Sequence, residues 1–170
     1  MKEIQTERFL IVPFDLNYLN DYYLGFDAEI TQYQYPDPFE SKEAAGKLLQ
    51  EFIDEMNQGE MLFLAILDKK GEFAGGLEVH GLAEEYPELG VWLKKDFQGK
   101  GYAYEALYHI IQHLNQTAQK KWYVYEADIR NKSSIGLVAK FAYQKEGIDE
   151  FTTESGKELK LQRYLINIKE

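Results

Sequence analysis

The stretch from Glu88 to Leu107, ELGVWLKKDFQGKGYAYEAL, constrains the fold more than any other part of the chain. It begins with an apolar run of strand type and continues through a loop with two glycines. Apolar residues then recur at helical spacing, at Ala106, Leu107, Ile110, Ile111 and Leu114. A strand that leads through a glycine-rich loop into a helix presents backbone N–H groups and the positive end of the helix dipole to an anion. The sequence therefore predicts an anion-binding loop between a strand and a helix.

Two common phosphate-binding loops fit this stretch poorly. A nucleoside triphosphate loop needs a Ser or Thr after its Lys, and here Gly101 follows Lys100. A dinucleotide loop needs a third glycine, and Tyr104 stands in its place. Glu126 and Asp128 do lie at a suitable distance downstream for a ribose contact. An NAD-binding domain therefore remains a minor alternative, although too little chain follows the loop for a doubly wound sheet.

A third pattern, Gln/Arg-x-x-Gly-x-Gly/Ala, is matched by Gln98, Gly101 and Ala103. Small residues there allow successive backbone N–H groups, from Gly99 through Lys100 and Tyr102 to Tyr104, to point at a pyrophosphate. Such a loop requires no metal ion. Because glycines at helix starts are common, the pattern alone is weak evidence.

Composition limits the classes of partner and compartment. The chain has 170 residues, enough for one core, so we expect a single domain over residues 1–170. Its formal net charge of -10 argues against nucleic-acid binding and suits a cationic partner. The absence of Cys excludes disulfides, thiolate metal sites and an acyl-cysteine intermediate. The longest apolar run, MLFLAIL, is far shorter than the ~20 residues of a membrane span, so we expect a cytoplasmic protein.

Hydrophobic periodicity predicts an α+β fold with a mixed sheet covered by helices. Asp15, Ser41 and Asn131 are candidate N-caps, and Gly59 ends the second helix. The segment 31–39 is expected to be extended, with breaks at Pro36 and Pro38. Strands are expected over residues 6–14, 61–67, 72–82, 88–93, 122–129, 143–151 and 160–168, and helices after Asp15, from Ser41 to Gly59, after Gly101 and from Asn131 to Phe141.

Three motifs in order resemble the GCN5-related N-acetyltransferase (GNAT) family, and within it the ribosomal-protein (Rim-type) subgroup. TERFLIVPF resembles the Thr-Glu-Arg opening of that subgroup, ELGVWLKKDFQGKGYAYEAL its strand, loop and helix, and ADIRNKSSIGLVAKFAYQKEG its Asn-x-x-Ser helix. Val12 departs from the usual Arg, and Phe141 to Tyr143 replace Leu-Gly-Phe. The resemblance implies a mostly antiparallel sheet that splays between two middle strands and carries helices on both faces.

The resemblance implies acetyl-CoA as cofactor, without a metal ion, and a site for each part of it. The implied cofactor-binding residues are Val91, Trp92, Leu93, Gln98, Gly99, Lys100, Gly101, Tyr102, Ala103, Tyr104 and Asn131. Ser134 would protonate the departing thiolate. Tyr143 is a rival donor, because a phenol is a stronger acid than a serine hydroxyl. As helix-cap residues, Asn131 and Ser134 also have a purely structural interpretation.

Transfer to an amine also needs a base, because an amine is mostly protonated at neutral pH. In GGLEVHG, strand alternation places Glu78 and His80 on one face, and Glu78 is the candidate base. A solvated polar strand face is the alternative interpretation. The Gly-Gly pair is typical of a bulge or of a close approach by a ligand.

The acceptor is expected to be a cationic amine, such as a peptide N-terminus, a polyamine or an aminoglycoside. Tyr33 and Tyr35 are its candidate binding residues, because an aromatic and acidic cleft attracts a cation. A homodimer is compatible with these features. The alternative from another class is a non-catalytic domain that binds or senses acyl-CoA.

Overall fold

The computed structural model describes residues 1–170 and has one sheet of eight strands in the order β1-β2-β3-β4-β5-β6-β8-β7. Every neighbouring pair is antiparallel except β5 and β6. The strands are β1 (Ile4–Gln5), β2 (Phe9–Pro13), β3 (Leu62–Asp68), β4 (Phe73–His80), β5 (Glu88–Leu93), β6 (Tyr123–Asp128), β7 (Ala142–Thr152) and β8 (Glu158–Asn167). This architecture confirms the predicted α+β class with a mixed, mostly antiparallel sheet.

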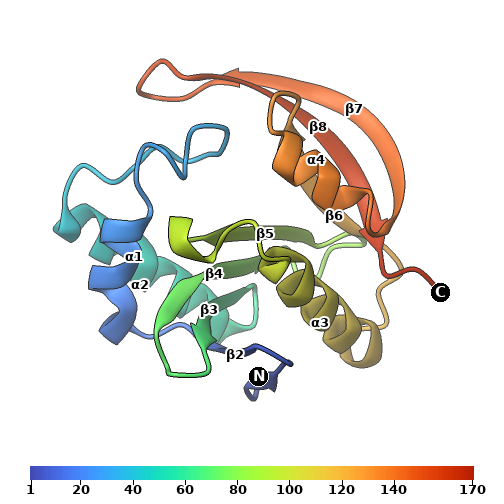
Figure 1. Ribbon diagram of the computed structural model, residues 1–170, viewed down its shortest axis with the longest axis horizontal. Helices are drawn as coiled ribbons and strands as arrows, with labels where there is room; N and C mark the ends of the chain where they lie inside the picture. The colour runs from blue at the N-terminus through green and yellow to red at the C-terminus, as the bar shows by residue number, and fades with distance from the viewer.

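Helices cover both faces of the sheet, as Figure 1 shows: α1 and α2 lie on one side, and α3 and α4 on the other. They are η1 (Leu16–Tyr18), α1 (Leu19–Gly25), α2 (Lys42–Gln58), η2 (Lys95–Phe97), α3 (Tyr102–Thr117) and α4 (Lys132–Val138). The predicted caps are confirmed: the side chains of Asp15 and Ser41 accept backbone N–H bonds, and Gly59 is left-handed at φ 79°. No helix has the length and apolar character needed to cross a membrane.

Strand β3 shows how the sheet divides the core in two. Leu64 and Ile66 pack with α3 and α4, whereas Phe63, Ala65 and Leu67 pack with α1 and α2. A continuous apolar run such as MLFLAIL is the expected sequence of a strand that is buried on both faces. The sheet therefore separates two hydrophobic cores, and each core is covered by its own pair of helices.

The sheet opens between β5 and β6. Their parallel pairing is confined to one residue pair, Glu88 with Val124, and the strands diverge toward the end of β5. This confirms the predicted splay between two middle strands. Beyond that pair, the edge of β5 that faces β6 is not paired with any strand. This unpaired edge includes the backbone around Val91.

Three local predictions were wrong. The first long strand begins at Phe9 rather than Thr6, because residues 6–8 form the turn between β1 and β2, closed by a Thr6 N–H bond to the Phe9 carbonyl (2.9 Å). Residues 31–33 lie in turns and are not extended. Helix α4 ends at Val138, before Phe141.

The loop before α2 is fastened to the turn between β7 and β8. The Asp37 carboxylate accepts hydrogen bonds from Thr153 Oγ1 (3.0 Å), Ser155 N (3.0 Å) and Ser155 Oγ (2.8 Å), and Lys157 Nζ lies 3.3 Å away. Lys157 Nζ also donates to the carbonyl oxygens of Thr31 (2.7 Å) and Gln34 (2.6 Å). We call this group of contacts around Asp37 the Asp37 latch. Figure 1 shows the loop before α2 below the hairpin of β7 and β8, on the same side of the molecule as the turn of that hairpin.

The Asp37 latch predicts a specific acid sensitivity. Desolvation raises the pKa of Asp37, but the bonds from Ser155, Thr153 and Lys157 outweigh it and lower that pKa to about 2, from 3.8. Stability from this carboxylate is therefore fully present above pH ~4 and is lost as the pH falls toward 2. We expect Asp37→Asn to be less stable than wild type at pH 7, with a difference that closes near pH 2. Urea unfolding between pH 2 and 7 measures it.

Glu40→Gln is the matched control, because Glu40 lies in the same loop and no side-chain hydrogen bond or ion pair involves it. A pH-independent difference between wild type and Asp37→Asn would contradict the ionic role of the latch.

Candidate active site

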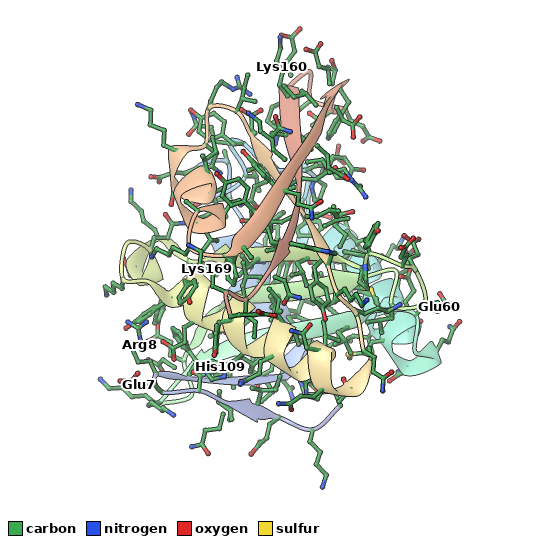
Figure 2. The ribbon with its side chains drawn as sticks, turned by 90° about the vertical axis from the view of Figure 1, so that its right-hand side faces the viewer. Glu7, Arg8, Glu60, His109, Lys160 and Lys169 are labelled. Carbon is green, nitrogen blue, oxygen red and sulfur yellow. The ribbon has the colours of Figure 1, made fainter.

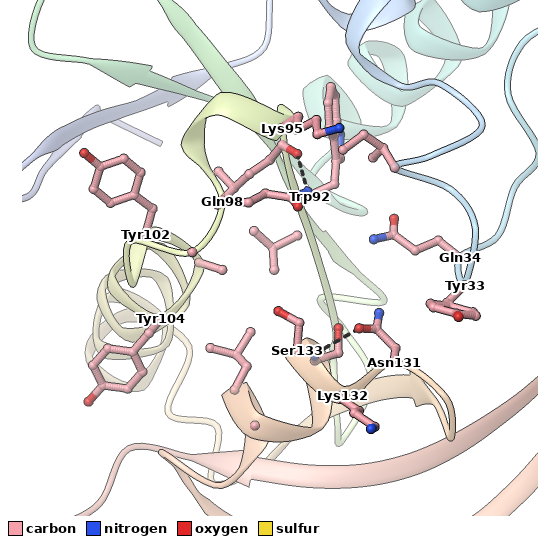
Figure 3. Close-up of a pocket in the computed structure, with 18 of the residues that line it drawn as sticks. Tyr33, Gln34, Trp92, Lys95, Gln98, Tyr102, Tyr104, Asn131, Lys132 and Ser133 are labelled. Atoms are coloured by element: carbon pink, nitrogen blue, oxygen red, sulfur yellow. Dashed lines mark hydrogen bonds between the residues drawn. The ribbon is translucent and has the colours of Figure 1, made fainter.

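A cavity of about 610 Å³ lies where β5 and β6 diverge. Figure 3 shows it between the end of β5, the first turn of α3, the start of α4 and the loop that carries Tyr33 and Gln34. The structure brings together in its wall the predicted residues Tyr33, Val91, Trp92, Leu93, Gln98, Gly99, Gly101, Tyr102, Ala103, Tyr104, Asn131 and Ser134. Most of the site residues predicted from the sequence therefore line one cavity.

The glycine loop is shaped to present backbone N–H groups. None of the amides from Gly99 to Tyr104 donates to an acceptor within the chain, and the first such helical bond is from Glu105 N to Gly101 O (3.2 Å). Gly99 and Gly101 take positive φ angles of 73° and 77°, which other residues adopt at a cost. Gln98 Nε2 donates to the Leu93 carbonyl (3.0 Å), so this side chain fastens the loop to the end of β5.

The charge of the cavity wall is opposite to that of the chain. Lys95, Lys132 and Lys140 line it together with a single acid, Glu29, whose carboxylate lies 2.8 Å from Lys95 Nζ. The whole chain carries a formal charge of -10. A local excess of lysine beside free amides is suited to a polyanion.

Helix α4 brings polar groups to the cavity opposite β5. Asn131 Oδ1 accepts from Ser134 N (3.2 Å), as an N-cap does, which leaves the Asn131 amide group to face the cavity. The preceding turn is held by the buried Asp128, which accepts from Arg130 Nε (2.8 Å), and Arg130 lies over the Tyr33 ring (5.1 Å). The structural and ligand-binding roles of Asn131 are compatible.

Tyr125 is a cavity residue that the sequence analysis missed. It is buried on β6, lines the cavity, and its hydroxyl lies 3.5 Å from Ser134 Oγ. Burial raises its pKa, and the Ser134 contact lowers it by less. The available signal was the alternation in WYVYEADI, which places Tyr123 and Tyr125 on the same buried face, next to the Asn-x-x-Ser helix in sequence.

Four predicted site residues lie outside the cavity wall: Glu78, Lys100, Tyr143 and Tyr35. Tyr143 is 52% exposed on the edge strand β7, beside Tyr164. Tyr35 is 65% exposed and packs against Phe151. Lys100 turns its ammonium to the Asp96 carbonyl (2.9 Å), so only its backbone belongs to the loop. Of the two candidate proton donors, the structure brings Ser134 to the cavity and not Tyr143.

Glu78 lies on the α1 and α2 side of the sheet, beside the opening. It pairs with Gly90 of β5, where a built Cβ would lie 3.9 Å from Glu78 Oε2, and Gly90 adjoins Val91 of the cavity wall. Tyr22 Oη donates to Glu78 Oε1 (3.3 Å), and His80 Nε2 lies 2.9 Å from Glu78 Oε2. The bond to Glu78 raises the pKa of His80, and the charges of Glu88 and Glu55 add to this.

The Gly-Gly pair before Glu78 leaves room for Trp92 of the neighbouring strand β5, for its backbone at Gly75 and for its indole at Gly76. A Cβ at Gly75 would lie 2.1 Å from the Trp92 carbonyl oxygen, and one at Gly76 would lie 2.6 Å from Trp92 Nε1. The expected bulge lies next to this pair: Ile66 and Leu67 of β3 pair with Gly75 and Phe73, so Ala74 is the extra residue on β4. The absence of a side chain at Gly76 makes room for the Trp92 indole, which packs against Tyr22 and Phe26.

The family model described as "Acetyltransferase (GNAT) domain" matches residues 8–144 of this chain. The chain belongs to the GNAT acetyltransferase family. No curated protein matches the sequence of this acetyltransferase significantly.

Solved structures of GNAT proteins share the fold of this acetyltransferase. The ribosomal L7/L12 alpha-N-protein acetyltransferase RimL, in complex with coenzyme A, is 20% identical, with 98% of each chain covered and a TM-score of 0.85. The microcin C7 self-immunity acetyltransferase MccE, with acetyl-CoA and AMP, is 20% identical over 95% of this chain and 93% of its own, with a TM-score of 0.83. The spermidine N-acetyltransferase of Vibrio cholerae, with CoA and spermine, is 15% identical over 92% and 94%, with a TM-score of 0.78.

The residues of this acetyltransferase fit acetyl-CoA, the donor that its family uses. The free amides of Gly99 to Tyr104 and the lysines of the wall suit phosphate groups. The unpaired edge of β5 around Val91 can pair with amide groups as a strand would. No group of three or more His, Asp or Glu side chains is arranged to hold a metal ion.

Proposed function

We propose that this acetyltransferase is a Rim-type enzyme that acetylates a primary amine which arrives as a cation. The acceptor is the α-amine of a protein N-terminus or a small cationic amine. The amine attacks the donor directly while both substrates are bound, since the chain has no Cys to carry the acetyl group. TERF at the start and NKSS before the last hairpin support the Rim-type subgroup.

The observation that carries this proposal is the separation of charge across the opening in the sheet. Lysines and free amides surround the cavity on one side, whereas Glu88 and Glu126 belong to β5 and β6, which border the opening, and Glu78 belongs to β4, the other neighbour of β5. Burial raises the pKa of Glu126, and the negative charges of Glu88 and Asp149 raise it further. An anionic donor is therefore attracted to the lysine-lined cavity, and a cationic acceptor is attracted to the acidic side chains.

Each side chain has a proposed task. Glu78, beside Gly90 and held by Tyr22 and His80, takes the proton from the ammonium. Ser134, whose hydroxyl faces the cavity next to Tyr125, gives a proton to the leaving thiolate. Bound acetyl-CoA supplies the activated thioester. The loop amides, Gln98 and Asn131 position it, and Tyr33 faces the acceptor.

A ligand and substrate panel tests the proposal. We expect acetyl-CoA and CoA to raise the melting temperature and NAD to leave it unchanged. In steady-state assays, peptide N-termini, polyamines and aminoglycosides are compared by release of free CoA, with intersecting initial-velocity patterns expected for direct transfer. CoA-induced stabilisation without CoA release from any amine would support an acyl-CoA-binding domain instead. Stabilisation by NAD alone would overturn the proposal.

We expect Ser134→Ala to lower kcat by about 100-fold, the lower end of general acid catalysis, because a thiolate needs less help to leave than an alkoxide. The KM for acetyl-CoA should change little. Tyr143→Phe is the matched control: it removes the rival hydroxyl, which is exposed on β7, and should leave kcat unchanged. A larger loss in Tyr143→Phe than in Ser134→Ala would reverse the assignment of the proton donor.

A further inference from the structure

The Thr-Glu-Arg motif at residues 6–8 lies outside the cavity wall, yet it contacts the helix that carries the glycine loop. Thr6 and Arg8 belong to the turn between β1 and β2, and Glu105 belongs to the first turn of α3. Figure 2 shows Glu7 and Arg8 beside the N-terminal end of α3. These contacts join positions that are 97 to 99 residues apart in the sequence.

The Glu105 carboxylate is fully engaged by this motif. Its Oε1 atom accepts from Thr6 Oγ1 (2.7 Å) and Arg8 N (2.8 Å), and its Oε2 atom accepts from Arg8 Nε (2.5 Å). Burial raises the pKa of Glu105, but the bonds from Thr6 and Arg8 outweigh it and lower that pKa. The neighbours Ala106 and Leu107 are fully buried and apolar. The Arg8 side chain is 40% exposed and the Glu105 side chain 10% exposed, and a partly exposed ion pair adds little net stability, so we infer that this pair serves to define geometry.

Arg8 extends from this carboxylate to the glycine loop itself. Its Nη1 atom donates to the Lys100 carbonyl oxygen (2.7 Å), and its guanidinium lies over the Tyr102 ring, 4.4 Å from the centroid. A Cβ built on Gly101 would lie 3.6 Å from Arg8 Nη2. One planar side chain therefore spans the loop and the first helical turn.

The direction of one carbonyl determines the direction of the next N–H group. In a trans peptide these two groups point to opposite sides, so a Lys100 carbonyl held toward Arg8 turns the Gly101 N–H away from Arg8. Gly101 lines the cavity and Arg8 does not. The bond from Arg8 thus turns the Gly101 amide away from the turn between β1 and β2.

We propose that Arg8, fixed by Thr6 and Glu105, is a positioning residue that holds the glycine loop in its phosphate-binding geometry without touching the donor. The inference rests on the proposed function of that loop, the binding of the acetyl-CoA phosphates. Arg8 then contributes to the affinity for the phosphate-bearing part of the donor and not to the chemical step.

Arg8→Lys tests this with two donors, acetyl-CoA and S-acetylpantetheine, which has the thioester but no phosphate. Lys keeps the charge but cannot bridge Glu105 and the Lys100 carbonyl as a planar fork does. We expect kcat/KM for acetyl-CoA to fall ~10-fold to 100-fold through KM, the range for charged hydrogen bonds. The value for S-acetylpantetheine should stay within about twofold of wild type.

Arg163→Lys is the matched control, because Arg163 Nε forms a similar pair with Glu146 Oε2 (2.8 Å) between β8 and β7. It should leave both donors unaffected. An equal loss for both donors in Arg8→Lys would show a merely structural role and overturn the inference, as would an unchanged KM for acetyl-CoA. If wild type itself does not prefer acetyl-CoA over S-acetylpantetheine, the proposed function of the loop fails instead. Arg8→Ala should repeat the pattern more strongly, and melting temperatures without ligand confirm that each variant is folded.

Discussion

Glu78→Gln is expected to lower kcat/KM for the amine by about 10²- to 10⁴-fold, the usual contribution of a general base. The substitution keeps the size of the side chain and its contacts with Tyr22 and His80. It removes only the ability to accept a proton from the ammonium. The donor should bind as before, because Glu78 lies outside the cavity wall that carries the loop.

The pH profile identifies the role of Glu78. Without the base, the rate should depend on amine that is already deprotonated in solution, so activity of Glu78→Gln should continue to rise with pH toward the pKa of the amine. Glu72→Gln is the control, since Glu72 is an exposed acid just before β4 that pairs only with Lys94 (3.6 Å). Activity of Glu78→Gln within about threefold of wild type, together with a larger loss in His80→Gln, would assign the base to His80 instead.

The second large effect is expected for the Gly101→Val variant, whose affinity for acetyl-CoA should fall by ~100-fold or more. Gly101 has φ 77°, and a β-branched residue is a steric outlier there. The space around the position is adequate, because the nearest atom to a built Cβ is Arg8 Nη2 at 3.6 Å. The expected loss comes from the backbone, which must leave the geometry that turns successive amides toward the cavity. Isothermal titration with acetyl-CoA and CoA measures it.

Gly71→Val provides the matched comparison. Gly71 has φ 83°, has nothing within 4 Å of a built Cβ, and lies in the turn between β3 and β4. Both variants should lose stability for the same conformational reason, but only Gly101→Val should lose affinity. If Gly101→Val and Gly71→Val bound acetyl-CoA with equal affinity, the glycine loop would not hold the donor.

Local signals in the sequence were sufficient for the main elements. The periodicity of α2 and its caps at Ser41 and Gly59 depend on residues within one helix, and the glycine loop is a contiguous pattern. Alternation along β4 also placed Glu78 and His80 on one face, and their side chains do meet. Such features are encoded by neighbours in the chain, which is why they can be read before the fold is known.

Contacts between distant segments were not predictable in this way. Asp37 meets Ser155, and Arg8 meets Glu105, across about a hundred residues, and nothing in local spacing marks these partners. Tyr125 was overlooked because a tyrosine on a buried strand is usually a core residue, and only the position of α4 brings Ser134 to it. Segment 31–39 was misjudged from its prolines, whereas the Lys157 ammonium, which binds the Thr31 and Gln34 carbonyls, stabilises turns there.

The single residue pair between β5 and β6 has a thermodynamic consequence for the enzyme in the cell. Part of the β5 edge is left unpaired and is open to a molecule from outside the chain. Any ligand that binds only the folded state raises the free energy of unfolding with its concentration, by about 2.7 kcal/mol at a hundredfold excess over Kd. Because CoA and acetyl-CoA are both expected to bind the folded state, resistance of this protein to proteolysis is expected to rise with the combined concentration of the two.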